Sequence, residues 1–110
     1  MWQAEVDVQH AALALVRGER SGALATVRAL LAGPHAAGLQ TTDRVECWRV
    51  LAANQAPEAD GWRQSTRALL MANALRIPNM ATREAYLTRI PEHRELMAAA
   101  PRGPAAAVGG

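Results

Sequence analysis

The side chains that could do chemistry in this chain of 110 residues are three histidines, one cysteine and ten acidic residues, and their spacing fits no known reactive motif. His10, His35 and His93 lie far apart and form no HExxH-type ligand pair, and Cys47 has no signature of an activated nucleophile beside it. The acidic residues lie beside Arg or at expected helix starts, where surface or capping roles explain them better than acid–base catalysis. We therefore expect no catalytic residue, no metal, no cofactor and no enzyme activity.

Phosphate recognition is the second chemistry to consider, because all twelve basic residues are Arg, whose planar guanidinium pairs well with phosphate. These arginines are scattered among the acidic residues, and the formal net charge is only +2. The glycines form neither GxGxxG nor GxxxxGK[ST], and the second motif is impossible without Lys. An Arg-dependent nucleic-acid binder stays open as an alternative function, but we do not expect nucleic acid as the partner.

The composition predicts a single helical domain with a thin hydrophobic core. Half of the residues are hydrophobic, but about a quarter of the chain is Ala and Phe is absent. Burial at about 25 cal/mol per Å² then hardly exceeds the entropy cost of ordering the chain, so support from a neighbouring repeat, a second copy or a partner is expected. The single cysteine and the absence of an apolar run of about 18 residues predict a cytoplasmic protein without a membrane span.

Gly and Pro divide the sequence into segments of helical length, which predicts an all-α fold. The expected helices cover residues 3–17, 20–32, 42–55, 59–76 and 80–97, where Pro91 either interrupts the last helix or starts a short new one. Residues 2–8 alternate between apolar and polar, which is strand spacing; we expect a helix there, with a strand pairing to another molecule's edge as the alternative. Residues 1–97 are then one helical-repeat domain, and residues 98–110 are a flexible tail.

Two of these helices carry the candidate interaction residues. Thr42 and Asp43 are expected to cap the helix over 42–55, and Trp48 is expected to pack in the core. The expected binding surface is the groove between the first helices of the two hairpins, and the residues on the helix expected to face it are Arg44, Trp48 and Arg49. The helix over 59–76 is apolar all round after Arg67, which is typical of a helix packed between neighbours. Its apolar residues are the candidates for self-association: Leu69, Leu70, Met71 and Leu75.

The first two helices resemble a tetratricopeptide repeat, in which small residues let two helices approach and a glycine makes the turn. The residues that carry this resemblance are Ala11, Gly18, Glu19, Ala23, Val27 and Leu30. Asp7 and His10 depart from the pattern, since large apolar residues are expected at both positions. The resemblance implies a short α-solenoid of two helical hairpins plus a terminal helix.

The second half of the chain resembles the closing helices of tetratricopeptide-like arrays in large bacterial ATPase regulators, such as those linked to LuxR-type transcription factors. The matching stretches are Arg49–Leu51, Ala68–Leu70, Arg76–Pro78, Arg83, Tyr86–Leu87 and Ile90–Leu96. The resemblance implies a protein-binding module, for example a regulatory or signalling adaptor, and no catalytic residue. The expected partner is another protein or a second copy of this chain, and self-association is an alternative function.

Overall fold

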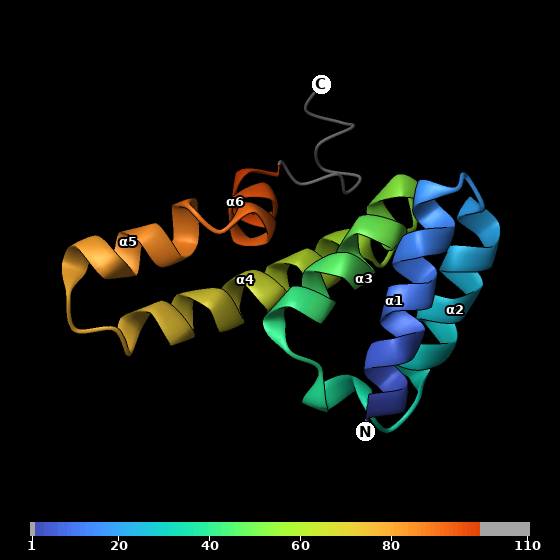
Figure 1. Cartoon of the computed structure of the whole chain (residues 1–110), viewed down its shortest axis with the longest axis horizontal. Helices are drawn as coiled ribbons and strands as arrows, with labels where there is room; N and C mark the ends of the chain where they lie inside the picture. The colour runs from blue at the N-terminus through green and yellow to red at the C-terminus, as the bar shows by residue number, and fades with distance from the viewer. Residues whose placement is uncertain (1, 100–110) are drawn as a thin grey trace. The chain divides into compact units, whose positions relative to one another are not determined.

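The computed structural model describes residues 2–99, and side chains from Ala4 onward. Within these residues the chain forms six α-helices and one short 3-10 helix (Figure 1). It separates into two compact units, which we call unit 1, ending at Ala56, and unit 2, beginning at Pro57. The all-α prediction is confirmed for the described residues. The expectation of one domain over residues 1–97 stays a prediction, and the expected tail lies outside the described residues from residue 100 onward.

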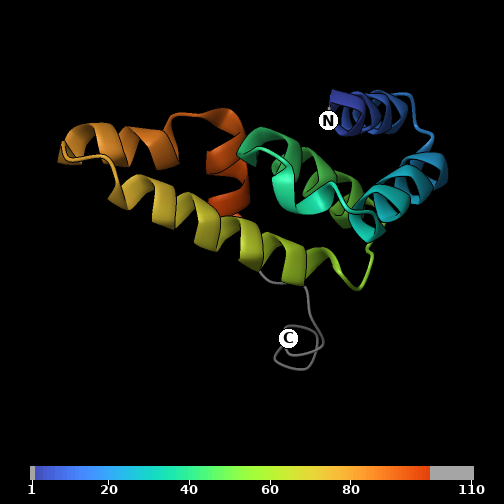
Figure 2. The same ribbon diagram turned by 90° about the horizontal axis from the view of Figure 1, so that it is seen from below.

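Unit 1 begins with two antiparallel helices, α1 (Trp2–Val16) and α2 (Arg20–Ala32), which pack side by side (Figure 2). Gly18 makes the turn between them with a φ of +83°, in the left-handed region that favours glycine. Its N–H donates to Leu15 O at 3.0 Å, and the next N–H, that of Glu19, donates to Ala14 O at 2.8 Å. The helix over the alternating residues 2–8 is confirmed, because α1 includes them, and the buried residues Ala4, Val8 and Ala11 follow a helical spacing.

The third helix of unit 1, α3 (Thr41–Ala53), packs on both α1 and α2. A 3-10 turn, η1 (Ala36–Gly38), precedes it and was not predicted. The expected capping by Thr42 and Asp43 is wrong, because α3 begins one residue earlier and Gln40 is its N-cap residue. Asp43 instead lies in the first turn of α3, where its side chain is buried.

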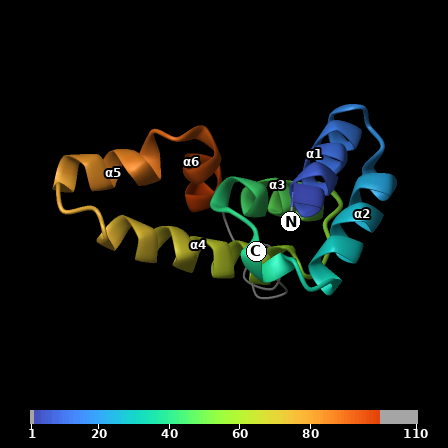
Figure 3. The same cartoon turned by 60° about the horizontal axis from the view of Figure 1, so that its bottom comes forward.

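Unit 2 consists of α4 (Ala59–Leu75), α5 (Met80–Thr88) and α6 (Pro91–Ala98), with α5 and α6 both packed against α4 (Figure 3). The turn between α4 and α5 is closed by Arg83, whose Nε and Nη2 donate to Ile77 O at 3.0 and 2.8 Å. As expected, Asn79 caps α5, since its side chain accepts from Thr82 N at 2.9 Å. Pro91 starts a new helix at its first position, so the segment 80–97 contains two helices.

Polar and aromatic contacts tie the three helices of unit 2 together. Asn73 Nδ2 of α4 donates to the Tyr86 hydroxyl at 3.2 Å. The His93 ring of α6 packs edge-on against the Tyr86 ring, with centroids 4.7 Å apart, and His93 Nδ1 lies 2.8 Å from Tyr86 O. Because a carbonyl only accepts, Nδ1 carries the proton. Leu70 of α4 and Leu96 of α6 are fully buried and form a small core, whereas α5 has half-buried side chains such as Tyr86 and Leu87.

The resemblance to a tetratricopeptide hairpin is supported only as pairwise packing of helices. α1 and α2 form an antiparallel pair with Ala11 and Ala23 buried, as small residues at a close helix approach should be. α3 is the third helix of unit 1, and α4 begins unit 2. The finer expectation, a solenoid of stacked hairpins, therefore stays a prediction.

Candidate functional site

The residues predicted to bind a partner on α3 are engaged within unit 1. The Arg44 guanidinium donates through Nε to Leu39 O at 3.0 Å and through Nη2 to Ala37 O at 3.0 Å. These bonds hold the segment around η1 against the start of α3. Arg49 forms an ion pair with Glu46, one turn before it on the same helix.

Trp48 is only 8% exposed and lies on α3 near Val45 and Leu51, which are completely buried. Its expected core position is confirmed. An indole that is already buried offers little surface for a partner, whereas interface anchors are accessible before binding. Binding through Arg44, Trp48 and Arg49 stays a prediction, and their observed contacts are those of residues that stabilise the fold.

Cys47, the single cysteine, is fully buried on α3. Burial is the main cause that raises the pKa of its thiol from 9.0 to about 12, and the nearby carboxylates of Asp43 and Glu46 raise this pKa further. Burial of the Asp43 carboxyl group, together with the charges of Glu5 and Glu46, raises the pKa of Asp43 above its usual 3.8. A thiol held in its protonated form is a poor nucleophile, so this cluster is structural.

The four residues predicted to mediate self-association lie on two sides of α4, one buried and one exposed to solvent. Leu70 is completely buried and Leu69 is half-buried. Met71 and Leu75, in contrast, are 38% and 70% exposed. The expectation that α4 is covered all round is therefore wrong, because one side of its C-terminal half lies open to solvent.

The open side of α4 is an apolar strip with an arginine at each edge. Successive residues lie about 100° apart around an α-helix, so Arg67 and Arg76 fall on opposite sides, about 180° from each other. The arc between them holds Ala68, Met71, Ala72 and Leu75, all of which are exposed. We call these four residues and the two flanking arginines the α4 face. Arg76 is the C-cap residue of α4 and keeps helical backbone angles, so the same geometry applies to it.

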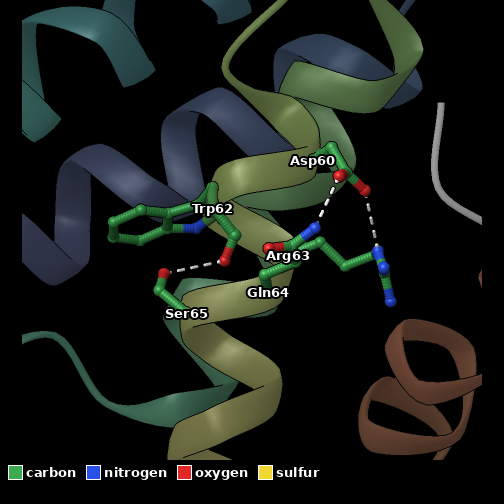
Figure 4. Close-up of polar contacts among 5 residues, drawn as sticks. All are labelled: Asp60, Trp62, Arg63, Gln64 and Ser65. Carbon is green, nitrogen blue, oxygen red and sulfur yellow. Dashed lines mark hydrogen bonds and ion pairs between the residues drawn. The ribbon is translucent and has the colours of Figure 1, made fainter. Parts of the chain in front are cut away.

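Acidic side chains are missing from the α4 face. The one acidic residue of α4 is Asp60, in its first turn, where it accepts from Arg63 Nε at 3.3 Å and from Gln64 Nε2 at 2.8 Å (Figure 4). The next acidic residue along the chain is Glu84. Figure 4 also shows the Trp62 ring pointing away from this cluster.

The arginines of this stretch fall into two classes. Arg63 and Arg83 are bonded to Asp60 and to Ile77 O. Arg67 and Arg76 are exposed, and neither guanidinium has a hydrogen bond or ion pair to any residue that the structure describes. The face therefore combines accessible apolar surface with two positive charges that have no intramolecular partner, which suits binding rather than catalysis.

Next to the α4 face, a shallow depression lies between α4 and α6. Its lining includes Arg67 and Ala68 of the α4 face, together with Gln64 of α4 and Met97 of α6. Arg63, which is 7% exposed, also lines it. The depression extends the open surface of α4 toward α6 and places a second guanidinium near that of Arg67.

Sequence reasoning missed Arg67 and Arg76 as site residues, although the signal was present. Both are nine residues apart on one helix, and a helical projection places them on either side of Met71 and Leu75. Which side of α4 is buried could not be read from the sequence, because Leu69, Leu70, Met71 and Leu75 are all apolar.

The described residues contain neither a metal-ligand cluster nor a membrane-spanning helix. No group of three or more His, Cys, Asp or Glu side chains between residues 4 and 99 is placed to hold a metal ion. None of the helices in the described part of the chain has the length and apolar character needed to cross a membrane.

Comparison with known proteins identifies no family. No protein-family model matches the chain, and neither the curated proteins nor the solved structures give a significant match.

Proposed function

We propose that this chain is a helical protein-binding module, with tetratricopeptide-like organisation, and that it binds a helical segment of another protein through the α4 face. The observation that carries the proposal is the exposure of Met71 and Leu75, one turn apart on the same side of α4. Two large apolar side chains at this spacing form the type of strip on which an amphipathic helix docks. Because Ala68 and Ala72 lie beside them, a partner backbone can approach closely.

The thin core supports the same proposal. Leu70 and Leu96 are the only fully buried Leu residues among the described residues of unit 2, so its core contains few large apolar side chains. Covering Met71 and Leu75 removes further apolar area from water, at about 25 cal/mol per Å². A partner that binds only the folded unit would therefore stabilise it by mass action.

Site-specific photo-crosslinking tests the proposal. A photoreactive phenylalanine derivative at position 71 or 75 should give discrete adducts with another polypeptide in the cell that makes this protein. The matched control is position 16, because Val16 is 83% exposed and, like Leu75, is the last residue of its helix. Adducts at position 71 should disappear when Leu75→Glu is added and persist when Val16→Glu is added.

Two results would contradict the proposal. Equal adduct patterns from positions 16 and 75 would show that crosslinking reports exposure alone. An adduct with twice the mass of the chain as the sole product would replace the module by the alternative function, self-association. Leu75→Glu should leave the helix content by circular dichroism unchanged, because the side chain is largely exposed.

A further inference from the structure

The charges at the edges of the α4 face specify the chemistry of its partner. Building on the proposed function, we infer that the α4 face binds an amphipathic helix that carries acidic residues on both sides of its apolar strip. Arg67 and Arg76 are the observation that carries this inference, since both are exposed and unpaired among the described residues. Opposite charges at the rim of an apolar interface steer association and fix the register.

The positions of the two arginines also constrain where the acidic residues lie. They are nine residues apart, which is about 13.5 Å along the helix axis at 1.5 Å per residue, and they are on opposite edges. A partner helix that runs along α4 then needs acidic side chains on its two edges, separated by about two and a half turns. The Met71 and Leu75 side chains lie between these two points and contact its apolar strip.

The depression between α4 and α6 favours an acidic side chain at the Arg67 edge. Arg63 also lines this depression, and its Nε donates to Asp60 Oδ1 at 3.3 Å, which holds the guanidinium in place. Gln64 is likewise held on Asp60 and adds polar surface there. A carboxylate that pairs with Arg67 would also meet the Arg63 guanidinium, which Asp60 already holds in place, and this reduces the entropy cost of binding.

A second copy of the chain is a poor occupant of the α4 face. Each edge of the α4 face carries one arginine. When two copies of α4 pack against each other, parallel or antiparallel, each edge of one copy therefore meets an arginine-bearing edge of the other. No acidic residue occurs between Gly61 and Arg83 to compensate these charges. Like charges placed together at an interface suppress that pairing, so the charge pattern favours a different, acidic chain.

Synthetic helices of opposite charge test the inference directly. Two fluorescent amphipathic peptides of equal length, with the same Leu and Ala strip, carry either Glu or Lys at both edges. Fluorescence polarisation at low salt should show about tenfold tighter binding of the Glu peptide, and this difference should shrink as salt is added. The double variant Arg67→Glu/Arg76→Glu should reverse the preference and favour the Lys peptide.

The matched control is Arg89→Glu/Arg94→Glu, which changes the net charge equally. Both residues are exposed and lie outside α4, and Arg89 is the C-cap residue of α5 as Arg76 is of α4. This control should keep the preference for the Glu peptide. If it removes the preference as fully as the α4 variant does, the binding follows net charge and the inference is overturned.

The remaining outcomes separate this inference from the proposed function. Equal binding of both peptides, lost in Leu75→Glu, would overturn the acidic partner and leave the docking face intact. Binding of neither peptide would overturn both. Tight binding to vesicles of anionic lipid, abolished by Arg67→Glu/Arg76→Glu and accompanied by no peptide preference, would replace the acidic helix by a membrane surface.

Discussion

Replacing Arg44 by Ala should destabilise unit 1, because this guanidinium connects α3 to the backbone around η1. It donates to three carbonyls, at 3.0 Å to Leu39 O, 3.0 Å to Ala37 O and 3.4 Å to Ala36 O. The longest bond shares Nη2 with the bond to Ala37, so two bonds carry most of the energy. Hydrogen bonds from charged groups contribute about 1.5–3 kcal/mol each, and partial exposure reduces this to about 1 kcal/mol each.

We therefore expect Arg44→Ala to lower the free energy of unfolding by about 2 kcal/mol, or the Tm by roughly 10 °C. Urea unfolding followed by circular dichroism measures the effect. Arg20→Ala is the control, because Arg20 is exposed and its side chain has no partner among the described residues; it should stay within about 0.5 kcal/mol of the parent. Equal stabilities of the two variants would refute the structural role and return Arg44 to the partner-binding residues that the sequence predicts.

Further predictions concern three residues, of which Cys47 and Asp43 are buried and Asn79 caps a helix. The Cys47 thiol should resist disulfide reagents at pH 8 until the protein unfolds, because its pKa is raised to about 12. Above pH 9 the unfolded state loses this proton and the folded state keeps it, so the free energy of unfolding should fall by about 1.4 kcal/mol per pH unit in a urea titration series. Asp43→Asn should raise the Tm at pH 7, since the raised pKa of Asp43 means that the fold favours the uncharged form. Asn79→Ala should cost about 1 kcal/mol in urea unfolding, whereas Asn79→Asp should retain most of the cap at Thr82 N.

The sequence predicts the helices well where glycine or proline sets their ends. Gly18 separates α1 from α2 through its positive φ, and Pro78 lies in the turn that follows α4. At Pro91 two outcomes remained open, and the structure selects a new helix. The missed element, η1, contains no proline and lies between Pro34 and Leu39, where the arginine that fixes it comes from the following helix.

The candidate site was less predictable, because burial depends on which helices pack together. Leu70 and Met71 are adjacent and both apolar, yet Leu70 is completely buried and Met71 is partly exposed. Likewise, Trp48 is large and apolar enough for either an interface or a core, and only the packing of α3 on α1 and α2 decides that it is buried. Arg44 and Arg67 are the same type of residue on predicted helices, and the sequence does not distinguish them. Only Arg44 lies within hydrogen-bond distance of backbone carbonyls.

The edge-on contact between Tyr86 and His93 gives unit 2 a built-in spectroscopic reporter. With the ring centroids 4.7 Å apart and the planes 62° from each other, the protons at the edge of one ring lie over the face of the other. The ring current of that face shifts their proton resonances upfield. Because the two residues belong to α5 and α6, detachment of α6 would move these resonances to their ordinary positions. A one-dimensional spectrum can therefore follow whether α6 is docked as denaturant is added.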